Sequence, residues 1–231
     1  MSNTLILIAR RRGMNGIIAD KNAKMALEVR SYSEHKGNAV DLVIDERPVD
    51  DSSFKHLDGL AYFNARCRHA MPHLRQSIID DYLGEHDYVL WIDADVIVSP
   101  VDVLEKLIEL SKSLGGAIVA PKVMSMKDPY WFYDTGGFIE DRGGKHGWAS
   151  NMPPYFEGRR LEQELVSVGA FYLVPSDVYR SGGRHKWLCD NTTDHYSICR
   201  HASDMGRKVV CDMKMSVWHA DLSKYEGEKD H

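Results

Sequence analysis

Two aspartates separated by one residue, Asp93 and Asp95, follow the mostly apolar run YVLWI at residues 88–92. In an extended chain the side chains at positions i and i+2 lie on the same face, so these carboxylates are neighbours. Adjacent carboxylates repel one another, and a divalent cation removes that repulsion. Oxygen ligands suit Mg²⁺ or Mn²⁺. We therefore interpret the pair as a metal site, and capping of the helix expected near residue 100 is the simpler alternative.

The position of the acid pair also favours a functional role. The apolar run predicts a buried strand, and both aspartates stand where that strand leaves the sheet at its carboxyl end, the edge at which open α/β sheets bind ligands. Near the end of the sequence, His219 follows a short apolar stretch, Val217-Trp218. A single histidine is more often structural than a ligand, and only the pattern of the whole chain favours a metal role for it.

The first half of the sequence alternates predicted strands and helices. Apolar runs predict strands at residues 4–9, 39–44, 88–92 and 117–120. Apolar periodicity predicts helices at residues 17–32, 60–83 and 100–113, the second bent at Pro72. This alternation predicts parallel strands with helices on both faces of the sheet.

The second half has a different pattern. Residues 128–154 are rich in Gly, Trp, Tyr and Pro and have no clean period, so we expect loops and short strands that could cover a site. The later elements predicted are strands at 165–174, 209–211 and 215–219, a short helix at 176–181, and a helix at 193–205 that Gly206 terminates.

The composition is that of a soluble globular protein, with 43% hydrophobic and 27% charged residues in a chain of 231. The formal net charge of −5 excludes general binding of nucleic acid by charge, although it leaves a local basic groove open. The four cysteines form no C-x-x-C pair, which excludes zinc-ribbon and thioredoxin-type sites and favours a reducing cytosol. The apolar runs are shorter than the roughly 18 residues of a membrane span, and residues 1–8 predict a buried strand rather than a signal peptide. We therefore expect a cytoplasmic protein without a membrane span.

Three segments together resemble nucleotide-sugar glycosyltransferases of the GT-A fold. They are YVLWIDADV, LVSVGAFYLVPSDVYRSGG, and TDHYSICRHASDMGRKVVCD followed by SVWHA. In order and spacing they most resemble the fungal mannan-polymerase α-mannosyltransferases and related viral and bacterial enzymes, over most of residues 4–221. Residues 128–154 match no part of that pattern, and the membrane anchor usual in the fungal enzymes has no counterpart here.

The resemblance implies an α/β fold of the Rossmann-like GT-A type, with a mixed, mainly parallel sheet flanked by helices. It implies one domain over residues 1–231, with a nucleotide-sugar-binding half at 1–125. The acceptor-binding half, at 126–231, would contain a smaller region of loops and strands. The implied activity is metal-dependent transfer of a sugar from a nucleoside-diphosphate sugar to an acceptor hydroxyl.

Individual residues take roles from the same resemblance. Asp93 and Asp95 are similar to the carboxylates that hold the metal (Mn²⁺ or Mg²⁺) and the donor diphosphate, and His219 is similar to a late metal ligand. Such a cation would stabilise the charge that builds on the leaving diphosphate.

Further residues are candidates for donor binding. Asp45, at the end of the second predicted strand, is similar to the acid that reads the donor base or ribose. Arg68 resembles an arginine that contacts the donor, but the family often has Arg-Asn where this chain has Arg68-His69, so Arg66 is an equal candidate. Arg10 begins a run of three arginines that could neutralise phosphates or could be a solvated loop.

The acceptor hydroxyl is a poor nucleophile, and an inverting transferase needs a base to take its proton. Asp194, at the start of the helix predicted at 193–205, is the candidate base, and capping or charging of the first helical turn is an equal alternative. In a retaining enzyme Asp194 would instead position a substrate. His195 could orient a substrate hydroxyl or simply pack.

Small and aromatic residues could also line the site. Gly169 and Ala170, at the centre of a predicted strand, would admit a ligand close to the backbone or allow dense packing against a helix. Flat aromatic side chains suit sugar rings and bases, and we expect substrate contact from at least one of Trp131, Tyr133, Trp148 and Tyr155.

Three other functional hypotheses stay open. A nucleotidyltransferase that makes a nucleotide-sugar would share the sheet and the acids, but it usually has a Gly-rich loop after the first strand, where this chain has only Gly13 and Gly16. An inactive nucleotide-sugar-binding module would share the fold. The acceptor could be a glycan, a protein, a lipid or a modified DNA base, and the basic segment 180–186 is the one feature that suits DNA.

Overall fold

The computed structural model describes residues 1–10, 16–48, 52–58, 61, 65–126, 138–141, 146–148, 162–188 and 194–220. The predicted aromatic contacts Trp131, Tyr133 and Tyr155 lie outside these ranges, as does the side chain of Trp148.

Ten strands form two sheets in the described residues: β1 (Asn3–Ala9), β2 (Ala39–Asp45), β3 (Tyr88–Asp93), β4 (Val96–Val98), β5 (Ile118–Ser125), β6 (Ile139–Asp141), β7 (His146–Trp148), β8 (Glu162–Leu165), β9 (Phe171–Pro175) and β10 (Val209–His219). The α-helices are α1 (Gly16–His35), α3 (Met71–Tyr82), α4 (Val103–Ser113), α5 (Ser176–Arg180) and α6 (Asp194–Asp204). A 3₁₀ turn, η1 (Ser52–Phe54), and a π-helical turn, η2 (Arg66–Ala70), complete the set.

The main sheet has the strand order β2-β1-β3-β9-β5-β10-β4, and β8 pairs with β10. β1 is parallel to β2 and β3, and β5 is parallel to β10. β9 is antiparallel to both β3 and β5, so these two point the same way. Five strands therefore end at one edge of the sheet, and this mixed, mainly parallel arrangement is the predicted one. β6 and β7 form a separate antiparallel pair.

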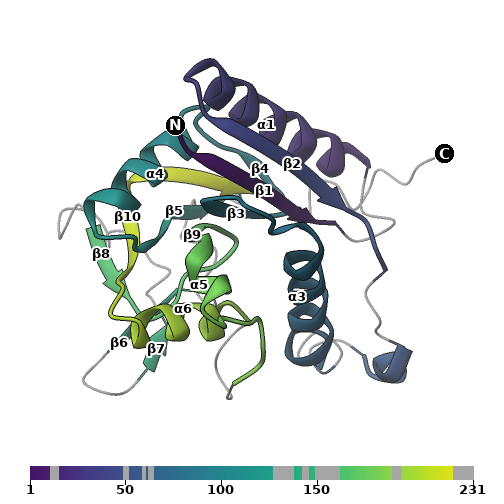
Figure 1. Cartoon of the computed structure of the whole chain (residues 1–231). Coiled ribbons are helices and arrows are strands. Elements are labelled where there is room, and N and C mark those ends of the chain that lie inside the picture. Colours follow the sequence, from purple (N-terminus) through teal and green to yellow (C-terminus); the bar gives the residue numbers. More distant parts are fainter. Residues whose placement is uncertain are drawn as a thin grey trace.

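Helices cover both faces of the main sheet, as predicted. α1 and α4 lie on one face, and α3, α5 and α6 lie on the other (Figure 1). Strands covered on both sides are apolar along their whole length rather than at alternate positions. Leu5, Ile6, Leu7 and Ile8 in β1 are all at most 1% exposed, which explains the continuous apolar run in the sequence.

Helix α3 begins differently from the prediction. We expected one helix over residues 60–83 with a bend at Pro72, but the π-helical turn η2 precedes α3 and Pro72 lies in the first turn of α3. Proline is tolerated there because the first N–H groups of a helix have no intrahelical acceptor. Residue 65 and Ala70 are also helical, so the predicted helical pattern continues through η2 into α3, and Pro72 lies just after the π-helical turn.

Two strand predictions were wrong in the same region of the sheet. The strand expected at 165–174 is two strands: β8 ends at Leu165 and β9 begins at Phe171, directly after Ala170, which has φ +54°. The strands expected at 209–211 and 215–219 are one strand, β10, with an irregularity in its pairing with β5 between Asp212 and Ser216.

Ala170 provides a test of backbone strain beside the site. A left-handed residue other than glycine costs about 1–2 kcal/mol, which glycine would recover, but glycine also loses a buried methyl group and gains chain entropy on unfolding. We expect Ala170→Gly to change the free energy of unfolding by less than about 1 kcal/mol. Ala202→Gly, at a buried position inside α6, should lower it by about 2 kcal/mol. Urea unfolding of both variants measures the difference, and equal losses would contradict strain at Ala170.

Candidate active site

Three of the predicted site residues lie at the edge where the parallel strands end. Ala9 of β1 is paired with Asp45 on one side and with Asp93 on the other, so the ends of β2, β1 and β3 are level. β10 ends at His219, which is paired with Ser125 at the end of β5. Strand direction and register thus bring the acid end of β3 and the histidine end of β10 to one side of the molecule.

Asp95 and His219 are in direct contact. Asp95 Oδ2 lies 2.9 Å from His219 Nε2, and the Ala220 backbone N–H donates to the Asp95 carbonyl oxygen at 2.8 Å. The His219 ring is buried, while the Asp95 side chain is about a third exposed. A contact between residues 124 positions apart in sequence is thus held by both backbone and side chain.

The orientation of the His219 ring leaves Nε2 directed at the carboxylate. Nδ1 lies 2.9 Å from the Ala220 carbonyl oxygen, which can only accept, so Nδ1 carries a proton. Burial by itself would lower the pKa of His219, but the hydrogen bond and the charge of Asp95 outweigh it, and the pKa is raised. The close approach of Nε2 and a carboxylate oxygen requires a proton or a cation between them.

Asp93 is oriented toward a different partner. Its Oδ1 lies 2.6 Å from Nη2 of Arg75, a buried arginine of α3. In the described part of the chain, no three side chains of His, Cys, Asp or Glu lie close enough together to hold a metal ion. The structure therefore brings together two of the three predicted ligands, Asp95 and His219. The third, Asp93, is paired with Arg75 instead.

The turn between β3 and β4 is fixed from α1. The buried side chain of Asn22 donates to the Val96 carbonyl oxygen at 2.7 Å and to the Asp93 carbonyl oxygen at 3.3 Å. The Asp93 backbone N–H donates to the Ala170 carbonyl oxygen at 2.7 Å. The backbone that carries both aspartates is thus held by α1 on one side and by the turn before β9 on the other.

Asp194 belongs to a second, buried part of the site. It is the first residue of α6, and its Oδ2 lies 2.9 Å from Arg75 Nε without the alignment of a hydrogen bond. Oδ2 also lies 3.8 Å from Nδ1 of the buried His185. Because Oδ2 has no hydrogen-bond partner among the described residues, it caps no backbone N–H of α6. The carboxylate faces Arg75, so its placement is not explained by capping through this oxygen.

The two histidines beside Asp194 are neutral. Burial lowers the pKa of His185 and of His195 to about 3. His195 Nδ1 lies 3.0 Å from the Tyr172 hydroxyl, and its ring meets the Tyr172 ring edge-on at 5.1 Å between centroids. His195 is therefore a buried neutral hydrogen-bonding group next to the carboxylate.

Neutral buried histidines make stability depend on pH. The unfolded chain binds a proton at each histidine below about pH 6.5, whereas the folded chain does so only near the lowered pKa of about 3. Their contribution is complete above that unfolded pKa and is lost as pH falls, by up to about 1.4 kcal/mol per pH unit for each histidine. We expect the free energy of unfolding in urea to fall steeply from pH 6.5 to pH 4.5. His185→Gln should reduce that slope and His56→Gln, at an exposed position, should not; equal slopes would contradict the assignment.

The predicted donor-binding residues have intramolecular partners. Asp45 is buried and is paired with Arg47, whose Nη2 lies 2.7 Å from Asp45 Oδ2. Arg10 contacts Glu46 Oε1 at 3.2 Å and donates to the Ala19 carbonyl oxygen at 2.9 Å. The Arg68 guanidinium lies 5.1 Å from the centre of the Trp187 ring.

Of these candidates, Asp45 lies at the end of β2, level with Asp93 across β1. Arg10 directly follows the last residue of β1, and its backbone N–H donates to the Asp45 carbonyl oxygen at 2.8 Å. The Arg66 side chain lies outside the described residues. Gly169 and Ala170 do lie beside the site, since the Ala170 carbonyl oxygen accepts a hydrogen bond from the Asp93 backbone N–H.

Arg75, Asn22 and His185 were not among the residues predicted from the sequence. Arg75 lies on the buried face of α3 together with Pro72, Leu74, Ile78 and Ile79. A charged residue at an apolar-face position of an amphipathic helix is a signal that could have identified it, because buried charges are rare unless they are paired.

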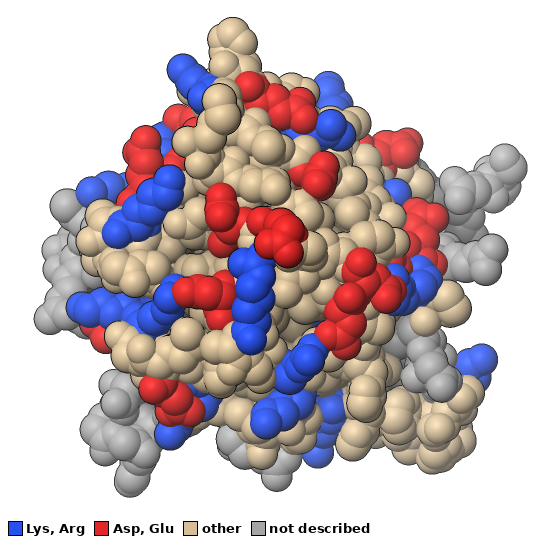
Figure 2. Space-filling model, viewed as in Figure 1, with Lys and Arg blue, Asp and Glu red and all other residues tan. Residues whose placement is uncertain are grey.

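The basic segment that could meet DNA is engaged within the protein. Arg180 donates to the carbonyl oxygens of Gly84 and His86, and Arg184 is paired with Asp80. On the face of the molecule in Figure 2, acidic and basic side chains are interspersed. These observations add no support to a DNA acceptor.

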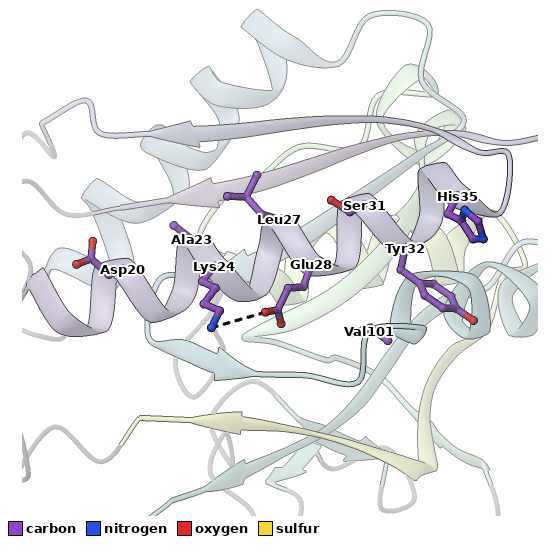
Figure 3. Close-up of a pocket in the computed structure, with 9 residues that line it drawn as sticks. All are labelled: Asp20, Ala23, Lys24, Leu27, Glu28, Ser31, Tyr32, His35 and Val101. Carbon is purple, nitrogen blue, oxygen red and sulfur yellow. Dashed lines mark ion pairs between the residues drawn. The ribbon is translucent and has the colours of Figure 1, made fainter.

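A groove of about 700 Å³ runs along the outer side of α1 and reaches Val101 (Figure 3). Leu27 and Val101 in its lining are exposed apolar side chains. None of its lining residues is a predicted site residue.

Comparison with known families gives one match. The family model Anp1 matches residues 20–155, which is more than half of the chain. No curated protein sequence matches. No described helix has the length and apolar character needed to cross a membrane.

Three similar solved structures are remote in sequence. GalNAc-T7 with UDP, GalNAc and Mn²⁺ is 12% identical with a TM-score of 0.51, and the match covers 95% of this chain but 44% of that one. Residues 1–349 of Staphylococcus aureus TarS are 7% identical with a TM-score of 0.51, covering 94% of this chain and 60% of that one. A Drosophila β1,4-galactosyltransferase 7 mutant with manganese, UDP-Gal and xylobiose is 12% identical with a TM-score of 0.49, covering 99% and 76%. The chain thus spans less than half of the GalNAc-T7 chain, and the likeness extends to the fold.

Proposed function

The chain belongs to the Anp1 family, a family of mannosyltransferases with the GT-A fold, and we propose that it transfers a sugar from a nucleoside-diphosphate sugar to an acceptor hydroxyl in a metal-dependent reaction. The observation that carries the metal dependence is the contact of Asp95 Oδ2 with His219 Nε2, 2.9 Å apart at the edge where the parallel strands end.

The chemistry of this pair fits a divalent cation. A carboxylate oxygen and an imidazole nitrogen are ligands that suit Mn²⁺, and Mg²⁺ prefers oxygen. The Ala220 carbonyl oxygen fixes the ring tautomer from the far side, as outer partners of metal-bound histidines do. Asp95 and His219 would hold the cation, and Asp93, which is paired with Arg75, would act through a bound water. When bound, the cation supplies charge stabilisation for the departing diphosphate.

The remaining residues would position the two substrates. Asp45 supports donor recognition by its place at the end of β2, although Arg47 occupies its carboxylate in this structure. Asp194 has an oxygen without a hydrogen-bond partner, which a substrate hydroxyl would satisfy. We assign Asp194 the acceptor side, as the base of an inverting reaction or as a positioning acid of a retaining one. His195, which is neutral and lies beside Asp194, would hydrogen-bond a substrate hydroxyl rather than a charged group.

A panel of nucleotide-sugars tests this function without knowledge of the acceptor. GDP-mannose, UDP-glucose, UDP-galactose and UDP-N-acetylgalactosamine would each be incubated with the protein, with Mn²⁺ or with a chelator. We expect slow, metal-dependent release of a nucleoside diphosphate from one of them. Release of a nucleoside triphosphate when pyrophosphate is added would favour a nucleotidyltransferase instead. Metal-dependent binding by calorimetry without turnover, even with simple sugar acceptors, would favour a binding module.

A further inference from the structure

A buried arginine joins the two parts of the site. Arg75 Nη2 lies 2.6 Å from Asp93 Oδ1, and Arg75 Nε lies 2.9 Å from Asp194 Oδ2. Its guanidinium is 5.1 Å from the centre of the Trp91 ring, which is itself fully buried. One side chain of α3 thus contacts β3 at two positions, Trp91 and Asp93, and the start of α6.

The charge balance of this group is unusual for a structural ion pair. One guanidinium faces two carboxylates, and the neighbouring His185 and His195 are neutral because burial lowers each pKa to about 3. Burial by itself would lower the pKa of Arg75, but the charges of Asp93 and Asp194 outweigh it, so Arg75 stays charged. The group therefore has two carboxyl groups for one guanidinium.

Stability alone gives little reason for such a group. Buried ion pairs are often no more stabilising than apolar side chains of similar size, because desolvation offsets the attraction. Arg75 Nη1 and Asp194 Oδ2 are buried and have no hydrogen-bond partner, so the hydrogen bonding of the group is incomplete in this structure. What the arginine does accomplish is to fix two carboxylates relative to one another, one at the cation edge and one at the start of α6.

We propose that Arg75 is a positioning residue, which holds Asp93 and Asp194 in one arrangement so that the donor and the acceptor hydroxyl are aligned for transfer. The inference rests on the proposed function. Arg75 acts through the two aspartates and makes no contact with the Asp95–His219 pair in the described structure. Its loss should therefore affect turnover more than binding, because a misplacement of about 1 Å can cost roughly 100-fold in rate.

The experiment compares Arg75→Met and Arg75→Lys with Arg200→Met as a matched control. Arg200 is an exposed arginine of α6 paired with Asp204. Three quantities would be measured: the melting temperature, the calorimetric affinity for Mn²⁺ with GDP or UDP, and kcat and KM for hydrolysis of the nucleotide-sugar from the panel that the wild type turns over.

We expect kcat of Arg75→Met to fall about 100-fold, with KM and the Mn²⁺–nucleotide affinity within about fivefold of the wild type. Arg75→Lys keeps the charge but lacks the planar fork, so it should fold and recover part of kcat. If Arg75→Met does not fold, Arg75→Lys decides alone: wild-type kcat overturns the inference, and a lower kcat at unchanged KM supports it. The inference would also be overturned if KM rose and the nucleotide affinity fell by the same factor as kcat.

Asp95→Asn in the same assays separates this inference from the proposed function. If Asp95→Asn retains metal-dependent nucleotide binding of wild-type affinity at low Mn²⁺, or if no nucleotide-sugar of the panel is hydrolysed, the proposed function fails. If Asp95→Asn loses that binding while the Arg75 variants behave like the wild type, only the role of Arg75 fails.

Discussion

Replacement of Asp95 by asparagine should reduce metal-dependent turnover of the donor on the order of 1,000-fold. The amide is a weaker metal ligand than the carboxylate, and loss of a cation at the leaving group removes several kcal/mol of transition-state stabilisation. Turnover would be measured as release of nucleoside diphosphate over a range of Mn²⁺ concentrations. Excess Mn²⁺ should restore part of the rate, because the cation would still be held by His219.

The fold of this variant should persist. Asp95 is held through its backbone carbonyl oxygen, which asparagine retains, and its side chain is partly exposed. Asp41→Asn is the control, since Asp41 pairs with His86 through a side chain that is 70% exposed. Asp41→Asn should keep wild-type turnover. Full turnover of Asp95→Asn at low Mn²⁺ would refute the cation assignment, whatever the fold shows.

Most of the sheet follows from local sequence patterns. The run YVLWI belongs to β3, which lies between β1 and β9 and is buried on both faces. Its unbroken apolar pattern is typical of such an interior strand. The alternation of such runs with amphipathic helices predicted the layers, and the structure and the family match confirm the GT-A fold. Two details failed because their causes are not local: the φ of +54° at Ala170 and the continuous pairing of β10 across an irregular register.

The candidate site was less accessible to sequence analysis. Strand ends located Asp93, but the contact of Asp95 with His219 depends on β10 pairing with β4, where His219 is opposite Val96, the residue after Asp95, and no local pattern specifies that pairing. Only the resemblance to a family suggested that Asp95 and His219 belong to the same site. Arg75, the partner of Asp93, was missed although its place on the apolar face of α3 was a usable signal. Arg47 is only two residues from Asp45, but nothing in the sequence pattern marks the two as an ion pair.

Replacement of Asp194 by asparagine should lower kcat on the order of 100-fold or more, while metal-dependent nucleotide binding stays unchanged. A base that takes a proton in the transition state contributes about 10²–10⁴-fold, and asparagine cannot take that proton. If Asp194 only placed negative charge in the first turn of α6, its loss would cost about 0.3–1 kcal/mol of stability and no rate. Asp204→Asn, at the exposed other end of α6, is the matched control.

Two assays on the same samples decide between these roles for Asp194. Urea unfolding measures stability, and donor turnover with a simple sugar acceptor measures rate. Because Asp194 shares Arg75 with Asp93, its effect on kcat should not add to that of Arg75→Met: the double variant should be about as slow as the slower single variant. A double variant slower by the product of both effects would mean that Asp194 and Arg75 act separately. An unchanged kcat in Asp194→Asn alone would mean that Asp194 only places negative charge in the first turn of α6, because a catalytic carboxylate cannot be lost without a change in rate.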